Sequence, residues 1–305
     1  MEVSDASFQI IADLLYAHTG QEITEARRWR IPTALNGIFR DLGIENVDQL
    51  VCVLSVGREP TLPRRIVEAL LNNETYFFRD REYFANLSQH VLPELMERRA
   101  STRQLRIWSA GCSTGQEPLS LAMLLSQQRE RWRHWSIEIV ATDVSSRAIE
   151  AARAASYNQF EIQRGISVAE MLLHFTEAGS QWRAKDDLRQ MIRFQQRNLL
   201  DEPPPGGPFD LVLCRNVLLY FDGATRGRAL AQLHSALAHD GWLMLGAGET
   251  APKQHHLFGP AGCGSGLYRP LPNDVGGLAN AVATRFRHFG WMAMSAVVAL
   301  AAAGY

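Results

Sequence analysis

The sequence has few cysteines, and none is placed for a cross-link or a metal site. No two of them have the CxxC spacing of a redox or zinc motif. The paired histidines at 255–256 have no acidic or cysteine neighbour, so we expect no metal. Disulfide frameworks and structural zinc are excluded, and a cytoplasmic location is favoured. The four cysteines are Cys52, Cys112, Cys214 and Cys263.

The chain also lacks an excess of charge of either sign. It carries 31 Lys and Arg residues against 32 Asp and Glu residues, and its isoelectric point is near 6.8. Proteins that capture nucleic acid or anionic lipid through their overall charge are strongly basic. We therefore expect no nucleic-acid partner, and a charged partner has to be recognised by a local patch.

No segment has the composition of a targeting sequence or the length of a membrane span. The N-terminal residues MEVSDASFQI are acidic and lack the basic and apolar regions of a secretory signal. Residues 291–305 are apolar but shorter than the roughly 20 residues that cross a bilayer as a helix. We expect no membrane insertion and treat residues 274–305 as a C-terminal tail whose role the sequence does not reveal.

The first pattern that is present is helical. Apolar residues recur at spacings of three and four in FQIIADLLYAHTG, WRIPTALNGIFRDLG and VDQLVCVLSVG. These runs end near Gly20, Gly43 and Gly57, and glycine is a common helix stop because it readily adopts the left-handed conformation. The pattern predicts a helical N-terminal domain over residues 1–75.

A different pattern of secondary structure begins near Gln104. Runs of strand character, LRIWSAG, IEIVATD, FDLVLCRN and GWLMLGAG, alternate with helical segments that begin near Glu117, Ser146 and Ala224. This alternation is typical of a doubly wound α/β fold, in which helices cover both faces of a parallel sheet. We assign residues 76–273 to this second domain.

The alternation is interrupted before the third long strand. Residues 181–183 and 191–196 have strand character, and we expect them to pair as a hairpin in a small antiparallel β insertion at about 176–197. The run PPPGGP then forces a loop, because proline removes hydrogen-bond donors and glycine relaxes the backbone.

The first candidate ligand site is the turn AGCSTG. Gly111 and Gly115 let backbone approach a ligand closely at the carboxyl end of the sheet. The turn lacks the GxGxxG dinucleotide fingerprint and the GxxxxGK[ST] phosphate loop, so a different nucleotide-like ligand is indicated. A tight turn between a strand and a helix needs glycine in any case, and a purely structural role stays open.

Two further strands end in polar residues. Asp143 ends IEIVATD, where a carboxylate can accept hydrogen bonds from both hydroxyls of a ribose, or can cap the helix near Ser146. Arg215, Asn216 and Tyr220 follow the buried strand FDLVLC, where polar groups face the ligand crevice of an open sheet. The alternative for Arg215 is a structural ion pair with a carboxylate.

A fourth segment, NETYFFR at Asn73–Arg79, would by itself indicate amphipathic packing. Taken in order, the four segments resemble the motifs of the chemotaxis receptor methyltransferases, the CheR family: NxTxFFR, a SAxxSTGxEPYS-type loop, an ATD strand end and FDxIxCRNVxIYF. The similarity extends from about Ser7 to about Arg269. It implies a Rossmann-like methyltransferase fold that uses S-adenosylmethionine. The implied activity is protein-glutamate O-methylation of chemoreceptors, or of a related sensory protein.

The resemblance also implies which residues bind the cofactor. Glu117 would receive its α-amino group, Asp143 its ribose, and the backbone of Asn198 and Leu199 its adenine region. The cofactor contacts predicted in this way are Asn73, Thr75, Arg79, Gly111, Glu117, Asp143, Asn198, Leu199, Arg215 and Asn216.

Arg79 and Tyr220 are the two residues that the resemblance places beside methyl transfer. A glutamate carboxylate has a pKa of about 4.3 in water and is ionised at neutral pH, so the reaction needs no general base. Catalysis then comes from alignment and desolvation. Arg79 would hold the acceptor carboxylate by a charge-assisted hydrogen bond, with Tyr220 as a second donor.

The N-terminal region departs from the family. The family's second helix is typically rich in arginine and is thought to meet acidic receptor helices, whereas the matching stretch here reads IPTALNGIFRDLG. Residues 1–75 hold seven Lys and Arg against eleven Asp and Glu, and only Arg27, Arg28 and Arg30 form a basic cluster, which can also be a solvated helix face. Methylation of another carboxylate acceptor therefore stays open. A non-catalytic, cofactor-binding regulatory module is a further alternative, which the two retained acceptor-facing residues disfavour.

Some members of the family hold a receptor's C-terminal pentapeptide at the edge of the β insertion, using a longer hairpin loop that contains glycine. The loop expected in that position here, residues 184–188, is charged and has no glycine. We expect no pentapeptide tether. Recognition would then depend on the arginine cluster and would be weak and salt-sensitive.

Overall fold

The computed structural model describes residues 3–250, 257–262 and 264–272. The expected tail at 274–305 and the histidine pair at 255–256 lie outside these residues. Within the described ranges, no helix combines the length and the apolar character that a membrane span requires.

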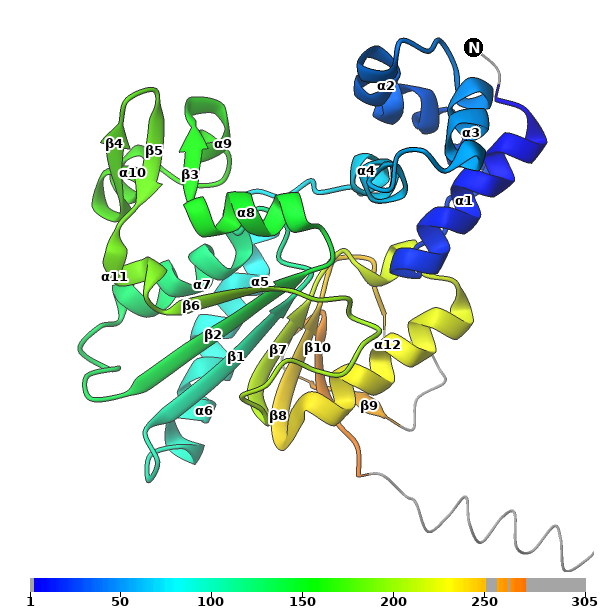
Figure 1. Ribbon diagram of the computed structural model, residues 1–305. Coiled ribbons are helices and arrows are strands. Elements are labelled where there is room, and N and C mark those ends of the chain that lie inside the picture. Colours follow the sequence, from blue (N-terminus) through cyan, green and yellow to red (C-terminus); the bar gives the residue numbers. More distant parts are fainter. Residues whose placement is uncertain (1–2, 251–256, 263, 273–305) are drawn as a thin grey trace, which may run out of the picture. The chain divides into compact units, whose positions relative to one another are not determined.

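The N-terminal part is helical, as the glycine-bounded runs predict (Figure 1). The residues after the first three helices, Gly20, Gly43 and Gly57, have φ of 73°, 66° and 67°, the left-handed conformation that ends a helix. A 3₁₀ turn, η1, covers Glu25–Arg27. The helices are α1 (Asp5–Thr19), α2 (Arg30–Leu42), α3 (Val47–Val56) and α4 (Leu62–Leu70).

These four helices bury a core of their own. Ile11 of α1, Leu35 of α2, Leu50 of α3 and Ile66 of α4 are fully buried in one apolar cluster. All members of this cluster come from residues 3–71. The helices are therefore stabilised mainly by one another, although a domain boundary at residue 75 stays a prediction.

Among the described residues, the main sheet has seven strands in the order β6-β2-β1-β7-β8-β10-β9. The first five strands in this order are parallel to one another, and β10 is antiparallel to both β8 and β9. The predicted doubly wound α/β fold is confirmed. The strands are β1 (Gln104–Ala110), β2 (Ser136–Asp143), β6 (Ile192–Gln196), β7 (Phe209–Cys214), β8 (Leu237–Leu245), β9 (Phe258–Pro260) and β10 (Leu267–Pro270).

Helices cover both faces of this sheet. Two successive residues of β1 show this, since successive side chains of a strand point to opposite faces. Ile107 of β1 joins an apolar cluster with α5, η2, α6 and α7, whereas the next residue, Trp108, joins the cluster that contains α12. The helices are α5 (Arg81–Asn86), the π-helical η2 (Leu87–Val91), α6 (Leu92–Arg98), α7 (Gln116–Gln127) and α12 (Gly223–Ala236).

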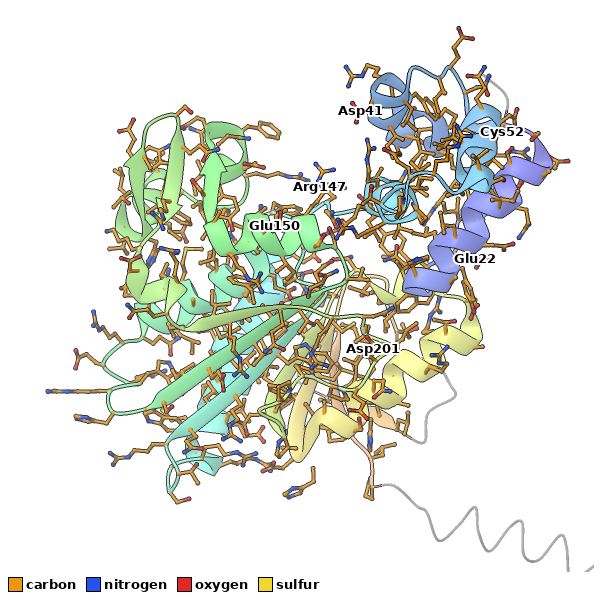
Figure 2. All side chains as sticks on the ribbon, viewed as in Figure 1. Glu22, Asp41, Cys52, Arg147, Glu150 and Asp201 are labelled. Carbon is orange, nitrogen blue, oxygen red and sulfur yellow. The ribbon has the colours of Figure 1, made fainter. Side chains whose placement is uncertain are left out.

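Helix α8 (Ser146–Ala154) follows β2 and is amphipathic. Ala148 and Ile149 are buried, and Ile149 packs in a small apolar cluster with side chains of the sheet. Arg147 and Glu150 project from the exposed side (Figure 2). The start of α8 is therefore fixed beside the carboxyl end of β2.

The small antiparallel sheet is present, but the predicted pairing of 181–183 with 191–196 is wrong. Its order is β3-β5-β4, and β4 and β5 form its hairpin through Gly179 and Ser180. Residues 192–196 instead form β6, parallel to β2 at the edge of the main sheet. The elements of this region are β3 (Ser156–Asn158), α9 (Gln159–Gln163), α10 (Val168–His174), β4 (Phe175–Ala178), β5 (Gln181–Ala184) and α11 (Asp186–Arg189).

Residues 184–188 therefore do not join two strands of the small sheet. Ala184 ends β5, and the chain turns directly into α11 at Asp186. The hairpin loop itself has two residues, and Gly179 has φ of 65°. The expectation that this loop lacks glycine was wrong, because it was based on the wrong strand pairing.

The strand order creates a crevice at one end of the main sheet. β1 has β2 on one side and β7 on the other, so the connections that follow these strands diverge. Ligands of open α/β sheets bind at such a switch point, beyond the carboxyl ends of the strands. Here that end carries Gly111, Asp143 and Arg215.

Candidate functional site

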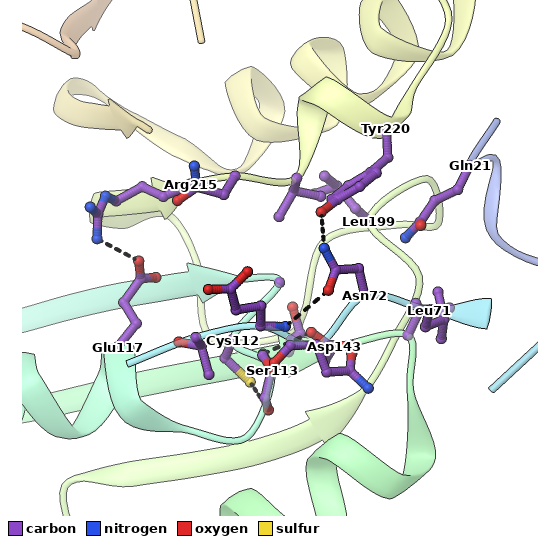
Figure 3. Close-up of a pocket in the computed structure, with 18 of the residues that line it drawn as sticks. Gln21, Leu71, Asn72, Cys112, Ser113, Glu117, Asp143, Leu199, Arg215 and Tyr220 are labelled. Atoms are coloured by element: carbon purple, nitrogen blue, oxygen red, sulfur yellow. Dashed lines mark hydrogen bonds and ion pairs between the residues drawn. The ribbon is translucent and has the colours of Figure 1, made fainter. Parts of the chain in front are cut away.

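An open pocket of about 890 Å³ lies at the carboxyl ends of β1, β2 and β7 (Figure 3). Six separate parts of the chain converge there: the end of α1, the segment after α4, the glycine-containing turn, the end of β2, the region after β6, and the segment after β7. Every residue that the sequence predicts as a site residue lines this pocket. They are Asn73, Thr75, Arg79, Gly111, Glu117, Asp143, Asn198, Leu199, Arg215, Asn216 and Tyr220.

The glycines of the turn are required by packing as well as by the pocket. Gly111 has φ of 79°, and a Cβ at this position would clash with Val217. Gly115 has φ of 93° and lies directly against Ala152 of α8. The structural reading of these glycines therefore holds, and it is compatible with a ligand role for Gly111.

Asp143 holds the two loops of the crevice together. Its Oδ2 accepts a hydrogen bond from the Ser113 amide at 2.8 Å, and its Oδ1 accepts one from the Ser145 amide at 2.9 Å. Burial raises the pKa of this carboxyl, and the two amide donors oppose that shift. The cap of α8 is Ser145, whose hydroxyl accepts from the Ala148 amide. Each carboxylate oxygen keeps a second lone pair for a ligand hydroxyl.

A buried charge cluster lies on the opposite side of the pocket. Arg215 NH1 is 3.1 Å from Glu117 Oε2 (Figure 3). Arg215 NH2 is 2.9 Å from Asp80 Oδ2. Ser109 donates to Glu117 Oε1 at 2.7 Å. Burial raises the pKa of Glu117, and Arg215 opposes that shift. Two carboxylates face one guanidinium, so with both ionised the cluster has an excess negative charge that suits a cationic amine.

Arg215 therefore has the structural role considered as an alternative from the sequence, because it forms ion pairs with two carboxylates. Its NH2 also donates to the Arg79 carbonyl at 2.6 Å, while its Nε is buried and has no partner among the described residues. Arg215 thus holds the segment before α5 against the sheet while it lines the pocket.

The segment 73–79 is both a packing element and a wall of the pocket. Phe77 is fully buried, and the Phe78 amide donates to Ser120 Oγ at 2.9 Å. The Asn73 carbonyl accepts from Ser113 Oγ at 2.7 Å, which ties the segment to the glycine-containing turn. Arg79 remains accessible in the pocket, and its NH1 donates to the Glu74 carbonyl at 3.1 Å.

Tyr220 lies at the end of the 3₁₀ turn η3 (Leu218–Tyr220) and faces the pocket. Its hydroxyl oxygen accepts from Asn72 Nδ2 at 2.7 Å, so its own hydrogen is available to a ligand (Figure 3). The guanidinium of Arg27 lies 5.5 Å from the centre of its ring. Tyr220 is therefore held between the N-terminal helical part and the sheet.

Asn198 and Leu199 form the wall beyond β6. Asn198 Nδ2 donates to the His18 carbonyl at 3.1 Å, and its Oδ1 accepts from the Leu200 amide at 3.0 Å. Leu199 is buried in the apolar cluster on one face of the sheet. This wall offers backbone polar groups and an apolar surface.

Sequence reasoning missed three supporting residues. Glu249 follows β8 and accepts from the amides of Asn216 at 2.6 Å and Gly246 at 2.9 Å, which fixes Asn216 at φ of 59°. An acidic residue just beyond a strand end was a usable signal, as it was for Asp143. Asp80 and Asn72 flank the segment at 73–79, and nothing in the sequence pattern distinguished them.

The predicted basic cluster is divided by the structure. Arg28 forms ion pairs with Asp5 at 2.7 Å and Glu25 at 2.6 Å, so it is neutralised within the chain. Arg27 and Arg30 instead line a smaller hollow of about 420 Å³. This hollow shares Gln21, Asn72 and Tyr220 with the main pocket.

Comparison with known proteins assigns a family. The family profile described as CheR methyltransferase, SAM binding domain matches residues 73–266. The chain is 33% identical to Chemotaxis protein methyltransferase 1 of Pseudomonas aeruginosa over 271 residues, which is 88% of this chain and 98% of that protein. It is 31% identical to a chemotaxis protein methyltransferase of Vibrio parahaemolyticus over 272 residues, with the same coverage.

Proposed function

Because the chain belongs to the CheR family of chemotaxis methyltransferases and uses S-adenosylmethionine, we propose that it methylates glutamate side chains of chemoreceptors. The observation that carries this proposal is the convergence on a single pocket of nine residues from the four sequence motifs, together with Asn198 and Leu199. We further propose that the acceptors are the receptors' cytoplasmic helices and that the protein acts in the cytoplasm.

The pocket's residues fit S-adenosylmethionine. The free lone pairs of Asp143 suit the ribose hydroxyls, and the negative cluster of Glu117, Asp80 and Arg215 suits the cofactor's α-ammonium group. Leu199 offers an apolar surface for adenine. When bound, the cofactor supplies the methyl group of its sulfonium.

Arg79 and Tyr220 would orient the acceptor carboxylate. Arg79 uses one N–H for the Glu74 carbonyl and retains others, and Tyr220 retains its hydroxyl hydrogen because Asn72 donates to its oxygen. The acceptor glutamate is ionised before it arrives, since its pKa in water is about 4.3. These two residues therefore align an existing nucleophile and do not need to remove a proton.

The acceptor side chain would approach through the smaller hollow. Arg27 and Arg30 line it, and it adjoins the main pocket at Tyr220. The two arginines outnumber Glu22, the acidic residue in the same lining, so the hollow attracts an acidic helix surface, and solvent screening keeps this attraction weak. Arg28 contributes nothing to it because its charge is already paired with Asp5 and Glu25.

We propose that the receptor is held without a pentapeptide tether. The β4–β5 loop has only two residues, Gly179 and Ser180, and is too short to shape a peptide site beside the small sheet. A different carboxylate acceptor is less well supported, because the relatives that match nearly their full length are chemotaxis methyltransferases.

The proposal is tested with labelled S-adenosylmethionine and receptor-containing membranes from the host. Base-labile methyl label on the receptor is expected with the wild-type protein and should be nearly lost with Arg79→Ala. A useful control is Arg28→Ala. This variant removes an arginine that is close in sequence to Arg27 and Arg30 but lines neither the main pocket nor the smaller hollow. Label on a small-molecule acid alone would refute the receptor assignment.

A further inference from the structure

Glu68 connects the helical part of the chain to the start of α8. It lies on α4, and its Oε1 accepts hydrogen bonds from the amide and from the hydroxyl of Ser146, both at 2.7 Å. Its Oε2 accepts from the hydroxyl of Ser145 at 2.6 Å. Three donors from two adjacent residues thus converge on one carboxylate.

These contacts lead directly to the carboxylate proposed to bind ribose. The Ser145 amide donates to Asp143 Oδ1 at 2.9 Å, and Asp143 Oδ2 in turn accepts from the Ser113 amide at 2.8 Å. Glu68 itself does not line the pocket. Any effect of Glu68 on a ligand must therefore act through its charge or through Ser145, which contacts both Asp143 and, at 3.5 Å from its Oγ, Nδ2 of the pocket residue Asn73.

The position of Glu68 follows from the needs of a helix start. The first amides of a helix have no partner within the helix, and a carboxylate there is also favoured by the helix dipole. Ser145 Oγ accepts from the Ala148 amide and at the same time donates to Glu68, so Glu68 fixes the rotamer of the capping side chain. Without Glu68 the hydroxyl hydrogen of Ser145 and the amide of Ser146 both lose their acceptor.

We propose that Glu68 is a positioning residue for the cofactor. It fixes the loop from Asp143 to Ser146, so that the Asp143 lone pairs are aligned with the ribose hydroxyls before the cofactor binds. This inference rests on the proposed cofactor site. It adds that a residue outside the four sequence motifs, and outside the pocket, sets the affinity of that site.

Glu68 could affect cofactor binding by positioning the loop or by its negative charge, and two related ligands distinguish these possibilities. S-adenosylmethionine and its demethylated product, S-adenosylhomocysteine, share the ribose, but only the former has a cationic sulfonium. A residue that aligns the ribose loop affects both ligands equally. A residue that acts through negative charge favours the cation and barely affects the neutral thioether.

The experiment is calorimetric titration of both ligands into the full chain and its variants. Glu68→Ala should weaken both ligands by about tenfold, ~1.4 kcal/mol, which is close to the lower limit for hydrogen bonds to a charged group. Glu68→Gln keeps one acceptor oxygen and should lose about threefold, less than the alanine variant. The matched control is Tyr16→Phe.

Tyr16 is a suitable control because it forms a different contact between α1 and the start of α12. Its hydroxyl lies 3.1 Å from both Asp222 Oδ2 and Thr225 Oγ1, and none of the three residues lines the pocket. Tyr16→Phe should leave both ligand affinities unchanged. A loss in this variant equal to that of Glu68→Ala would show a general effect of loosening the helical part and would overturn the proposal.

Ser146→Ala approaches the same contact from the other side and keeps the Ser145 cap. It should weaken both ligands by a few-fold, and its effect should not add to that of Glu68→Ala, because both changes remove the same contact. Full affinity for both ligands in folded Glu68→Gln and Ser146→Ala overturns the proposal, as does a loss confined to S-adenosylmethionine. Absence of cofactor binding by the wild-type protein would instead refute the proposed function.

Discussion

Asp143 accepts two backbone amides in the structure and is proposed to bind the ribose as well, and its substitution combined with a matched control separates these two roles. Each carboxylate oxygen accepts one backbone amide, from Ser113 and from Ser145, and in the proposed site each also accepts a ribose hydroxyl. Asp143→Ala should therefore weaken S-adenosylmethionine binding by about 1.5–3 kcal/mol, the range for hydrogen bonds to a charged group. This corresponds to roughly ten- to a hundred-fold in the dissociation constant.

The same substitution should also destabilise the protein without cofactor. Two buried amides lose their acceptors, at a cost of about 1–3 kcal/mol each before water or local rearrangement compensates. Burial raises the pKa of the Asp143 carboxyl, so keeping this group ionised at neutral pH lowers the stability of the folded protein. Removing the carboxyl abolishes this cost and offsets part of the stability that is lost with the two amide hydrogen bonds. The net loss in the free energy of unfolding should therefore lie at the lower end of the range of about 1–3 kcal/mol for each amide.

Asp222→Ala is the matched control for these measurements, because it also removes a carboxylate that accepts a backbone amide at a helix start. Asp222 also accepts a backbone amide at a helix start, from Thr225 at 2.7 Å, and it does not line the pocket. Calorimetry should show reduced affinity only for Asp143→Ala, whereas thermal unfolding should show destabilisation in both variants. Wild-type affinity in a folded Asp143→Ala protein would mean that Asp143 only holds the two loops together.

Three other predictions concern chemistry, stability and docking. Arg79→Ala should reduce kcat much more than it reduces cofactor affinity, and comparable losses in single-turnover and binding assays would contradict its role on the acceptor. Hydrogen bonding from Arg99 holds the pKa of Asp240 well below its usual range, so this pair stabilises the protein above about pH 4 and its contribution is lost as the pH falls. Asp240→Asn should remove about 1.5–3 kcal/mol at neutral pH and flatten the acid limb of the unfolding profile, and an unchanged limb would refute this. Tryptophan-containing peptides from receptor C-termini should not bind with micromolar affinity, and calorimetric detection of such binding would show that a tether exists despite the two-residue loop at 179–180.

The sequence predicted the position of the site because strand ends are local features. Asp143 and Arg215 each follow a buried apolar run, and parallel strands bring such ends to one edge of the sheet. That the glycine-containing turn and the segment at 73–79 join them was implied by the resemblance to a family. The structure adds the contacts that hold these parts together, such as the one from Ser113 to the Asn73 carbonyl.

The errors concern partners that are distant in sequence. Residues 192–196 have strand character, but nothing local specifies that they pair with β2 at the sheet edge and not with residues 181–183. Arg28 was grouped with its neighbours because charge alone was considered, whereas it pairs with Asp5, 23 residues earlier, as well as with the nearby Glu25. Glu68 drew no attention because helix α4 gives no sign of what its polar face contacts.

The most direct test of the central claim is peptide mapping of a purified chemoreceptor after incubation with the protein and S-adenosylmethionine. Mass spectrometry should find methyl esters on specific glutamates of the receptor's cytoplasmic helices. These esters should be absent when Arg79→Ala replaces the wild-type protein and should disappear after mild base. A receptor that remains unmethylated, while the wild-type protein binds the cofactor normally, would contradict the claim that receptor glutamates are the acceptors.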